Sequence, residues 1–238
     1  MNLRNSAPPK TAVVAEDMTG KSRLTVCCPG RLATTIASFL LLLLALLASC
    51  DSNTSNPSQA KPEAKAPELL TGRAAFQKVF IAARNYAPDV KPFRIQSTSS
   101  TDGNGHDGKS AIWQASFASA SRRGVKPFIW SGTDAPDAPS RGISPGNEDT
   151  YNPNNASTQV FDVGFLKVDS DQAYTEAQKH GGDKVLEKDS KIPVIYICDW
   201  NHNTNELTWH VIYGGSREDA KLTVAINAST GAFIRVEK

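Results

Sequence analysis

The residues best suited to do chemistry lie near the C-terminus. Cys198 and His202 are four positions apart, and His210 follows eight positions later. A thiol beside an imidazole is the pairing that a cysteine nucleophile needs, and both groups are common zinc ligands. A cysteine enzyme also needs an oxyanion hole and a closed zinc site needs four ligands, and the sequence supplies neither. Because Cys198 ends an apolar run, we expect it to be buried packing, and we predict no catalytic residue, metal or cofactor.

The segment 102–108 superficially resembles a calcium-binding loop. Its glycine is one position late, and Trp113 stands where the bidentate glutamate should be. We therefore expect a mobile hairpin tip. The sequence has no G-x-S-x-G, H-E-x-x-H or glycine-rich phosphate-binding motif either, so it does not predict an enzyme.

Tryptophan is the other residue type that points to binding, because indoles are enriched at the centres of interfaces. Trp113 and Trp209 lie in predicted strands that face predicted helices, so we expect both in the core. Trp200 lies in the polar stretch 199–205 and has the best claim to exposure. The sequence thus names Trp200 and His202 as a possible binding surface.

An export signal is indicated by the apolar, uncharged segment 33–49. Its parts follow the order of a secretory signal: basic residues, an apolar stretch (Ile36 to Leu47) and small residues. The basic residues are Lys21, Arg23 and Arg31. Met18 is an alternative translation start, which would give a shorter signal peptide of residues 18–49.

The four residues Leu47-Ala48-Ser49-Cys50 resemble the lipobox of bacterial lipoproteins. The resemblance implies that residues 1–49 are a signal peptide, removed before Cys50, and that Cys50 carries the acyl chains (palmitate or similar) of a stable membrane anchor. An uncleaved apolar helix is the alternative, since the segment just reaches the shortest membrane-spanning length. Asp51 resembles the inner-membrane retention signal of enterobacterial lipoproteins and slightly favours that membrane over the outer one.

Charge excludes a nucleic-acid partner. Five of the 26 basic and two of the 24 acidic residues precede Cys50, which leaves 21 against 22, a net charge of −1. Such a balance gives no drive for counterion release from DNA or RNA. Cys198 is the one cysteine expected in the folded part, so no internal disulfide is predicted.

Two similar segments follow a polar tether at 50–67. Thr71 and Asp169 are each the expected N-cap of an amphipathic helix, and the two helix patterns match at an offset of 98 residues. Strand patterns follow each helix, with Trp113 and Trp209 in matching positions. The sequence predicts an α+β fold of two related α-β-β-β units, 68–131 and 159–238, each an antiparallel sheet packed against a helix.

The segment 132–158 separates the two units and is rich in proline, glycine and asparagine. It is either a linker or a segment that lies across a binding surface, and we favour the linker. Phe161, Val163 and Phe165 then alternate with polar or small residues, a pattern typical of a strand, so we expect one more strand there.

The C-terminal residues resemble the end of a PepSY domain. An aromatic strand from Trp209 to Tyr213 is followed by a strand that runs into the turn Asn227-Ala-Ser-Thr-Gly231 and a final strand. The resemblance covers about 165–238 and, more faintly, 68–131, where the Thr-Gly turn is missing. It implies a non-catalytic module that binds a protein or inhibits a peptidase.

Together these patterns predict a lipoprotein of the bacterial cell envelope, anchored to the inner or outer membrane with its domain outside the cytoplasm, commonly the periplasm. Its expected partners are the membrane and an envelope protein. Two alternatives stay open: an envelope enzyme that uses Cys198 with His202 or His210, and a structural or assembly lipoprotein.

Overall fold

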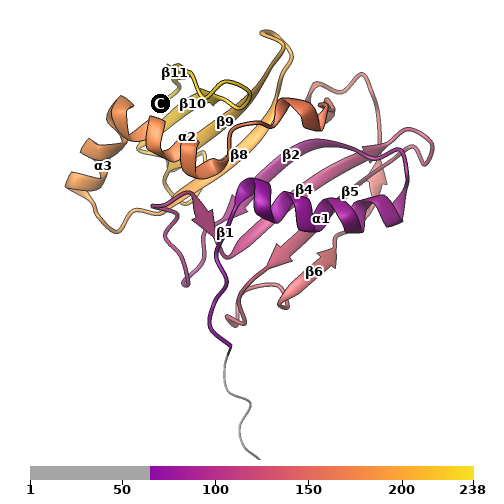
Figure 1. The fold of residues 1–238 in the computed structure, drawn as a ribbon, viewed down its shortest axis with the longest axis horizontal. Coiled ribbons are helices and arrows are strands. Elements are labelled where there is room, and N and C mark those ends of the chain that lie inside the picture. Colours follow the sequence, from indigo (N-terminus) through magenta and orange to yellow (C-terminus); the bar gives the residue numbers. More distant parts are fainter. Residues whose placement is uncertain (1–64) are drawn as a thin grey trace, which may run out of the picture. The chain divides into compact units, whose positions relative to one another are not determined.

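The computed structural model describes residues 65–238, which belong to one compact unit (Figure 1). The predicted signal peptide at 1–49, the lipidation site Cys50 and all of the tether 50–67 except its last residues lie outside the described part. None of the helices within 65–238 is long and apolar enough to cross a bilayer.

The fold is mixed, mostly antiparallel sheet with a few helices, as the sequence predicts. The strands are β1 (Leu70–Thr71), β2 (Lys91–Thr98), β3 (Lys109–Ser110), β4 (Ile112–Ser119), β5 (Gly124–Ser131), β6 (Gly142–Pro145), β7 (Asp149–Thr150), β8 (Val194–Asn201), β9 (Glu206–Tyr213), β10 (Leu222–Asn227) and β11 (Phe233–Val236). The helices are α1 (Gly72–Tyr86), α2 (Ser170–Ala177) and α3 (Asp183–Lys188), with the short turns η1 (Ala156–Thr158), η2 (Val163–Phe165) and η3 (Gln178–Gly182).

One sheet, rather than the two expected, joins the halves of the chain. Its order is β11-β10-β9-β8-β2-β4-β5-β6, with β7 also paired to β5. The join is the antiparallel pair β2–β8, in which Ile95 lies opposite Cys198. Each half would otherwise end in an open strand edge, and pairing the two edges satisfies their backbone groups.

The main core lies between this sheet and the helices α1 and α2 (Figure 1), and Ile195, Ile212 and Ala220 form a small separate cluster. One face of α1 is buried, with Phe76 and Val79 on it, whereas Ile81 of the same helix is exposed. Trp113 and Trp209, 1% and 0% exposed, confirm the prediction that both are core residues. Their rings meet edge to face at the centre, with centroids 6.3 Å apart.

Each of these indoles also ties a strand to the start of a helix. The ring N–H of Trp113 donates to the carbonyl of Leu70 at 2.8 Å, just before α1. The ring N–H of Trp209 donates to the carbonyl of Val168 at 2.9 Å, just before α2. Buried indole groups are thereby satisfied, and the two helices are held in matching positions on the sheet.

The carboxylate of Asp169 caps both helices. It accepts from the backbone N–H of Ser170 at 2.7 Å in α2, where Gln172 completes the predicted capping box. It also accepts from the backbone N–H of Arg73 at 2.8 Å in α1. Thr71 is the N-cap residue of α1 as predicted, but its hydroxyl donates to Asp169 instead of accepting from its own helix. Two helix N-termini therefore share one anion.

Three segments of the chain have a different structure from the one predicted from the sequence. The segment 132–158 is not merely a linker, because β6 and β7 within it pair with β5. An edge strand pairs on one side only and tolerates the polar composition that suggested a linker. The expected strand at 161–165 is the helical turn η2, and the helix from Asp169 is interrupted at Gly181, whose φ is +106°.

The segment 102–108 is also not a free hairpin tip. Tyr196 donates its hydroxyl proton to the carbonyl of Gly105, and the N–H of Val194 donates to the carbonyl of Asn104 at 2.8 Å. Gly105 has a φ of +78°, and a β-carbon there would overlap the carbonyl oxygen of Val194. The glycine thus permits the first half to pack closely against the second.

We expect Asp169→Ala to lower the free energy of unfolding by about 1 to 4 kcal/mol, because it removes the caps of two helices and one cap is worth about 0.5 to 2 kcal/mol. Urea unfolding followed by circular dichroism measures the change. Asp162→Ala is the matched control, since Asp162 caps only the short turn η2. Equal losses from the two substitutions would contradict the double role of Asp169.

Candidate binding site

Trp200 and His202 border the same open hollow at the end of β8. Its volume is about 510 Å³. The other lining residues are Tyr151, Pro153, Gln159, Val160 and Asn205. The hollow therefore brings the two residues predicted as a binding surface next to the end of the segment predicted as a linker.

The hollow exists because β2 and β8 separate. Their pairing extends only to Arg94 opposite Asp199, and the register of β2 shifts at Pro92. The backbone of 159–161 occupies the gap, where the N–H of Phe161 donates to the carbonyl of Pro92 at 2.9 Å. Beyond Asp199, β8 pairs only with β9 among the described strands, so Trp200 stands at an open edge.

Phe165 completes the aromatic part of the site. Its ring lies 5.2 Å from that of Trp200, centroid to centroid, and the side chain is 45% exposed. The turn η2 places it there, because Asp162 accepts from the N–H of Gly164 at 2.7 Å. This contact was not expected from the sequence, although the Asp-x-Gly spacing is itself a turn signal.

No residue that lines the hollow has a permanent charge. It presents aromatic rings, amide groups and one imidazole, and it is open to solvent on one side. Aromatic side chains with few rotatable bonds supply contact area at a low cost in conformational entropy. The arrangement suits a neutral, partly apolar ligand better than an ion.

Cys198 lies apart from both histidines that were considered as its partners. It is 0% exposed and packs in the core beside Trp209, its cross-strand partner. His210 follows Trp209 on β9, so its side chain is on the opposite face of the sheet. Burial, and then the Asp199 carboxylate, raise the pKa of the Cys198 thiol well above its usual range. A neutral, enclosed thiol does not support the alternative of a cysteine enzyme.

His210 is instead held between two carboxylates on the face of the sheet away from the helices. Nδ1 lies 2.7 Å from Glu237 and Nε2 lies 3.2 Å from Asp199. Only the charged imidazolium can donate to both acceptors. Arg94 and Arg235 bind the outer oxygens of the two carboxylates, at 3.4 Å and 2.6 Å.

These contacts shift the acidities in opposite directions. Burial alone lowers the pKa of His210, but the hydrogen bonds and charges of Asp199 and Glu237 outweigh it and raise the pKa above 6.5. Burial by itself would raise the pKa values of Asp199 and Glu237. The hydrogen bonds from His210 and nearby positive charges outweigh burial, so the pKa of Asp199 lies below its ordinary 3.8 and that of Glu237 below its ordinary 4.5. Within 65–238, no group of three or more His, Cys, Asp or Glu residues is arranged to hold a metal ion.

The stability of the domain should therefore depend on pH through His210. Because its folded pKa is raised, its contribution is complete below about pH 6.5 and is lost as the pH rises through the folded value. The carboxylates contribute above about pH 4.5 and lose their contribution as the pH falls. We expect His210→Gln to lower the free energy of unfolding by about 1.5 to 3 kcal/mol at pH 6 and by less at pH 9.

Urea unfolding at several pH values checks this expectation. His202→Gln is the control, because His202 lies in the exposed turn between β8 and β9 and should leave the profile unchanged. A parallel loss at every pH in His210→Gln would show that the charge of the imidazole is not what stabilises the fold.

Comparison with known proteins adds one structural likeness. No protein-family model matches the sequence, and no curated protein is similar to it. A solved structure, that of a candidate lipoprotein from Clostridium difficile 630, matches with a TM-score of 0.47 and 8% sequence identity. The match covers 74% of this chain and 95% of that chain.

Proposed function

We propose that this chain is a lipid-anchored protein of the bacterial cell envelope, whose folded part is a non-catalytic module that binds another protein. The observation that carries the binding role is the hollow beside Trp200, with the exposed ring of Phe165 against the indole. Exposed aromatic residues of this kind are typical of interface centres.

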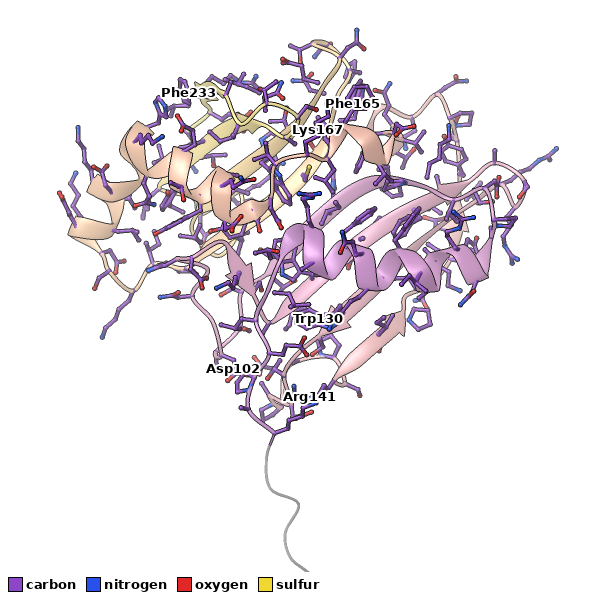
Figure 2. The ribbon with its side chains drawn as sticks, in the orientation of Figure 1. Asp102, Trp130, Arg141, Phe165, Lys167 and Phe233 are labelled. Atoms are coloured by element: carbon purple, nitrogen blue, oxygen red, sulfur yellow. The ribbon has the colours of Figure 1, made fainter. Side chains whose placement is uncertain are left out.

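The position of the hollow fits a tethered domain. Arg141 donates to the carbonyls of Lys65 and Ala66, the first described residues, at 2.9 and 3.3 Å. Figure 2 shows Arg141 at one end of the drawn domain and Phe165 at the other. A partner that approaches the hollow would thus meet the domain on the side away from the proposed anchor.

The two halves are, in this proposal, a duplicated unit. Each has a helix followed by antiparallel strands, and the joining strands β2 and β8 occupy equivalent places. The bonds from Trp113 and Trp209 to the starts of α1 and α2 repeat at matching positions. Two equivalent strands that pair antiparallel are what a twofold relation between repeats produces.

The likeness of the second half to PepSY domains also belongs to this proposal. The side chain of Asn227 accepts from the N–H groups of Ser229 and Thr230 at 2.9 and 3.0 Å, and Gly231 has a φ of +79°. This turn joins β10 to β11 as the family pattern requires. A peptidase is accordingly the first partner to test, with the module acting as inhibitor or regulator.

Removal of the Trp200 indole should weaken partner binding at least tenfold, because central aromatic residues of interfaces contribute about 2 kcal/mol or more. The test is quantitative pull-down from detergent-solubilised envelope with the lipidated full chain and its Trp200→Ala and Phe165→Ala variants. Phe233→Ala is the matched control, since Phe233 is also partly exposed, at 36%, but lies elsewhere. Recovery of the same partners by all four proteins would argue against the hollow as the binding site.

Lipidation is tested separately. Mass spectrometry of the mature protein should find Cys50 as the N-terminal residue with acyl chains attached, and Cys50→Ala should leave the precursor uncleaved. The wild-type protein should also enter the detergent phase in a Triton X-114 separation. A native protein with residues 1–49 retained and the Cys50 sulfur unmodified would contradict the proposal of a lipid anchor.

A further inference from the structure

A second hollow lies at the opposite end of the domain, between α1 and the edge strand β6. It has a volume of about 620 Å³ and is the most apolar of the hollows described. Ile81 and Ile143 stand on it with 70% and 43% of their side chains exposed. The buried ring of Trp130 contributes to its wall, with the Lys78 ammonium 5.6 Å from the ring centroid. The proposed binding module does not use this surface.

The matching place in the second half of the chain is filled. There, the edge strand β11 contributes Phe233, whose ring stacks on His180 at a centroid distance of 3.7 Å. His180 lies in η3, directly after α2, so the contact joins the edge strand to the helical layer. In the first half Ile81 and Ile143 have no such partner among the described residues. Their side chains form an exposed apolar patch, a kind of surface that marks interaction sites.

Charge surrounds this apolar surface. Three cations, Lys65, Lys78 and Arg141, line the hollow with one anion, Glu68, which pairs with Lys78 at 2.9 Å. One further carboxylate, Asp134, binds Arg141 at 2.8 Å from outside it. With Glu68 and Asp134 counted, the three cations leave a net charge of +1 here, whereas the described residues as a whole are balanced, with 20 basic and 20 acidic side chains. Exposed isoleucines beside lysine ammonium groups are typical of surfaces that insert among anionic headgroups.

The path of the chain places this surface near the bilayer. Lys65 is on the rim of the hollow, and its carbonyl is held by Arg141. Cys50 is 15 residues upstream of Lys65, a length that spans at most about 50 Å when fully extended. A chain anchored at Cys50, as proposed above, therefore keeps the α1–β6 surface within reach of the lipid headgroups.

We propose that the α1–β6 surface docks onto an anionic phospholipid bilayer, with Ile81 and Ile143 inserted at the interface and Lys65 and Lys78 beside the headgroup phosphates. Docking would fix the orientation of the domain and hold the Trp200 hollow away from the membrane. It would also add a second attachment to the anchor, since stable membrane binding commonly combines a lipid chain with a basic patch.

The test uses the mature chain, residues 50–238, with Cys50→Ser, so that no acyl chain contributes. We expect this protein to sediment with vesicles of phosphatidylglycerol and phosphatidylethanolamine but not with vesicles of phosphatidylcholine alone. The double variant Ile81→Asp, Ile143→Asp should bind at least tenfold more weakly, and Lys78→Glu about fivefold or more. Phe233→Asp is the matched control and should bind as the parent does, and thermal unfolding checks that each variant is folded.

Three outcomes would overturn the proposal. One is no binding to the anionic vesicles, and another is equal binding by the parent and the double variant. The third is a dimer in solution that the double variant abolishes, because the surface would then pair with a second copy. Trp200→Ala should keep its vesicle binding, so failure of this proposal and failure of the partner-binding proposal are distinguishable. The absence of acyl chains likewise separates the result from the question of lipidation.

Discussion

The architecture depends on one carboxylate. Two helix N-termini, each with unsatisfied N–H groups and a partial positive charge, meet at Asp169, which accepts from α1 at Arg73 and from α2 at Ser170. Without an anion between them the two ends would repel each other across a partly buried space. Because both helices begin at this point, their apolar faces fall on one side of one sheet and form the main core with Trp113 and Trp209 at its centre.

The shape of the sheet follows from the same arrangement. Helices fixed side by side bring β2 and β8 together, and the two strands pair only as far as Arg94 and Asp199. Past that point Pro92 turns β2 away, and the end of β8 places Trp200, half-buried against the core, in the wall of the hollow. The aromatic hollow is thus a consequence of how the halves are joined, and it would not exist in either half alone.

The sequence predicts what local patterns encode. The capping box at Asp169 and the buried indoles each arise within a few residues and are found, as are the alternating strands other than the one expected at 161–165. The bond from Asp169 to α1 and the contact of Phe165 with Trp200 were not predicted, because they join residues 96 and 35 positions apart. The edge strand β6 was missed for another reason. A strand with one partner and little burial has the composition of a loop.

If the halves are a duplicated unit, their differences are as informative as their likeness. The same gap between helix and edge strand is closed by Phe233 on His180 in one half and left open beside Ile81 and Ile143 in the other. Phe233 keeps 36% of its side chain exposed, so the halves differ chiefly in the ring that covers the edge-strand side chain and in the exposure of Ile81, at 70%. Closure of the gap in the second half shows that the scaffold accepts an aromatic side chain there. In the first half the gap stays open, so Ile81 and Ile143 are exposed beside Lys65 and Lys78, close to the start of the tether. This is the surface proposed to dock onto the membrane.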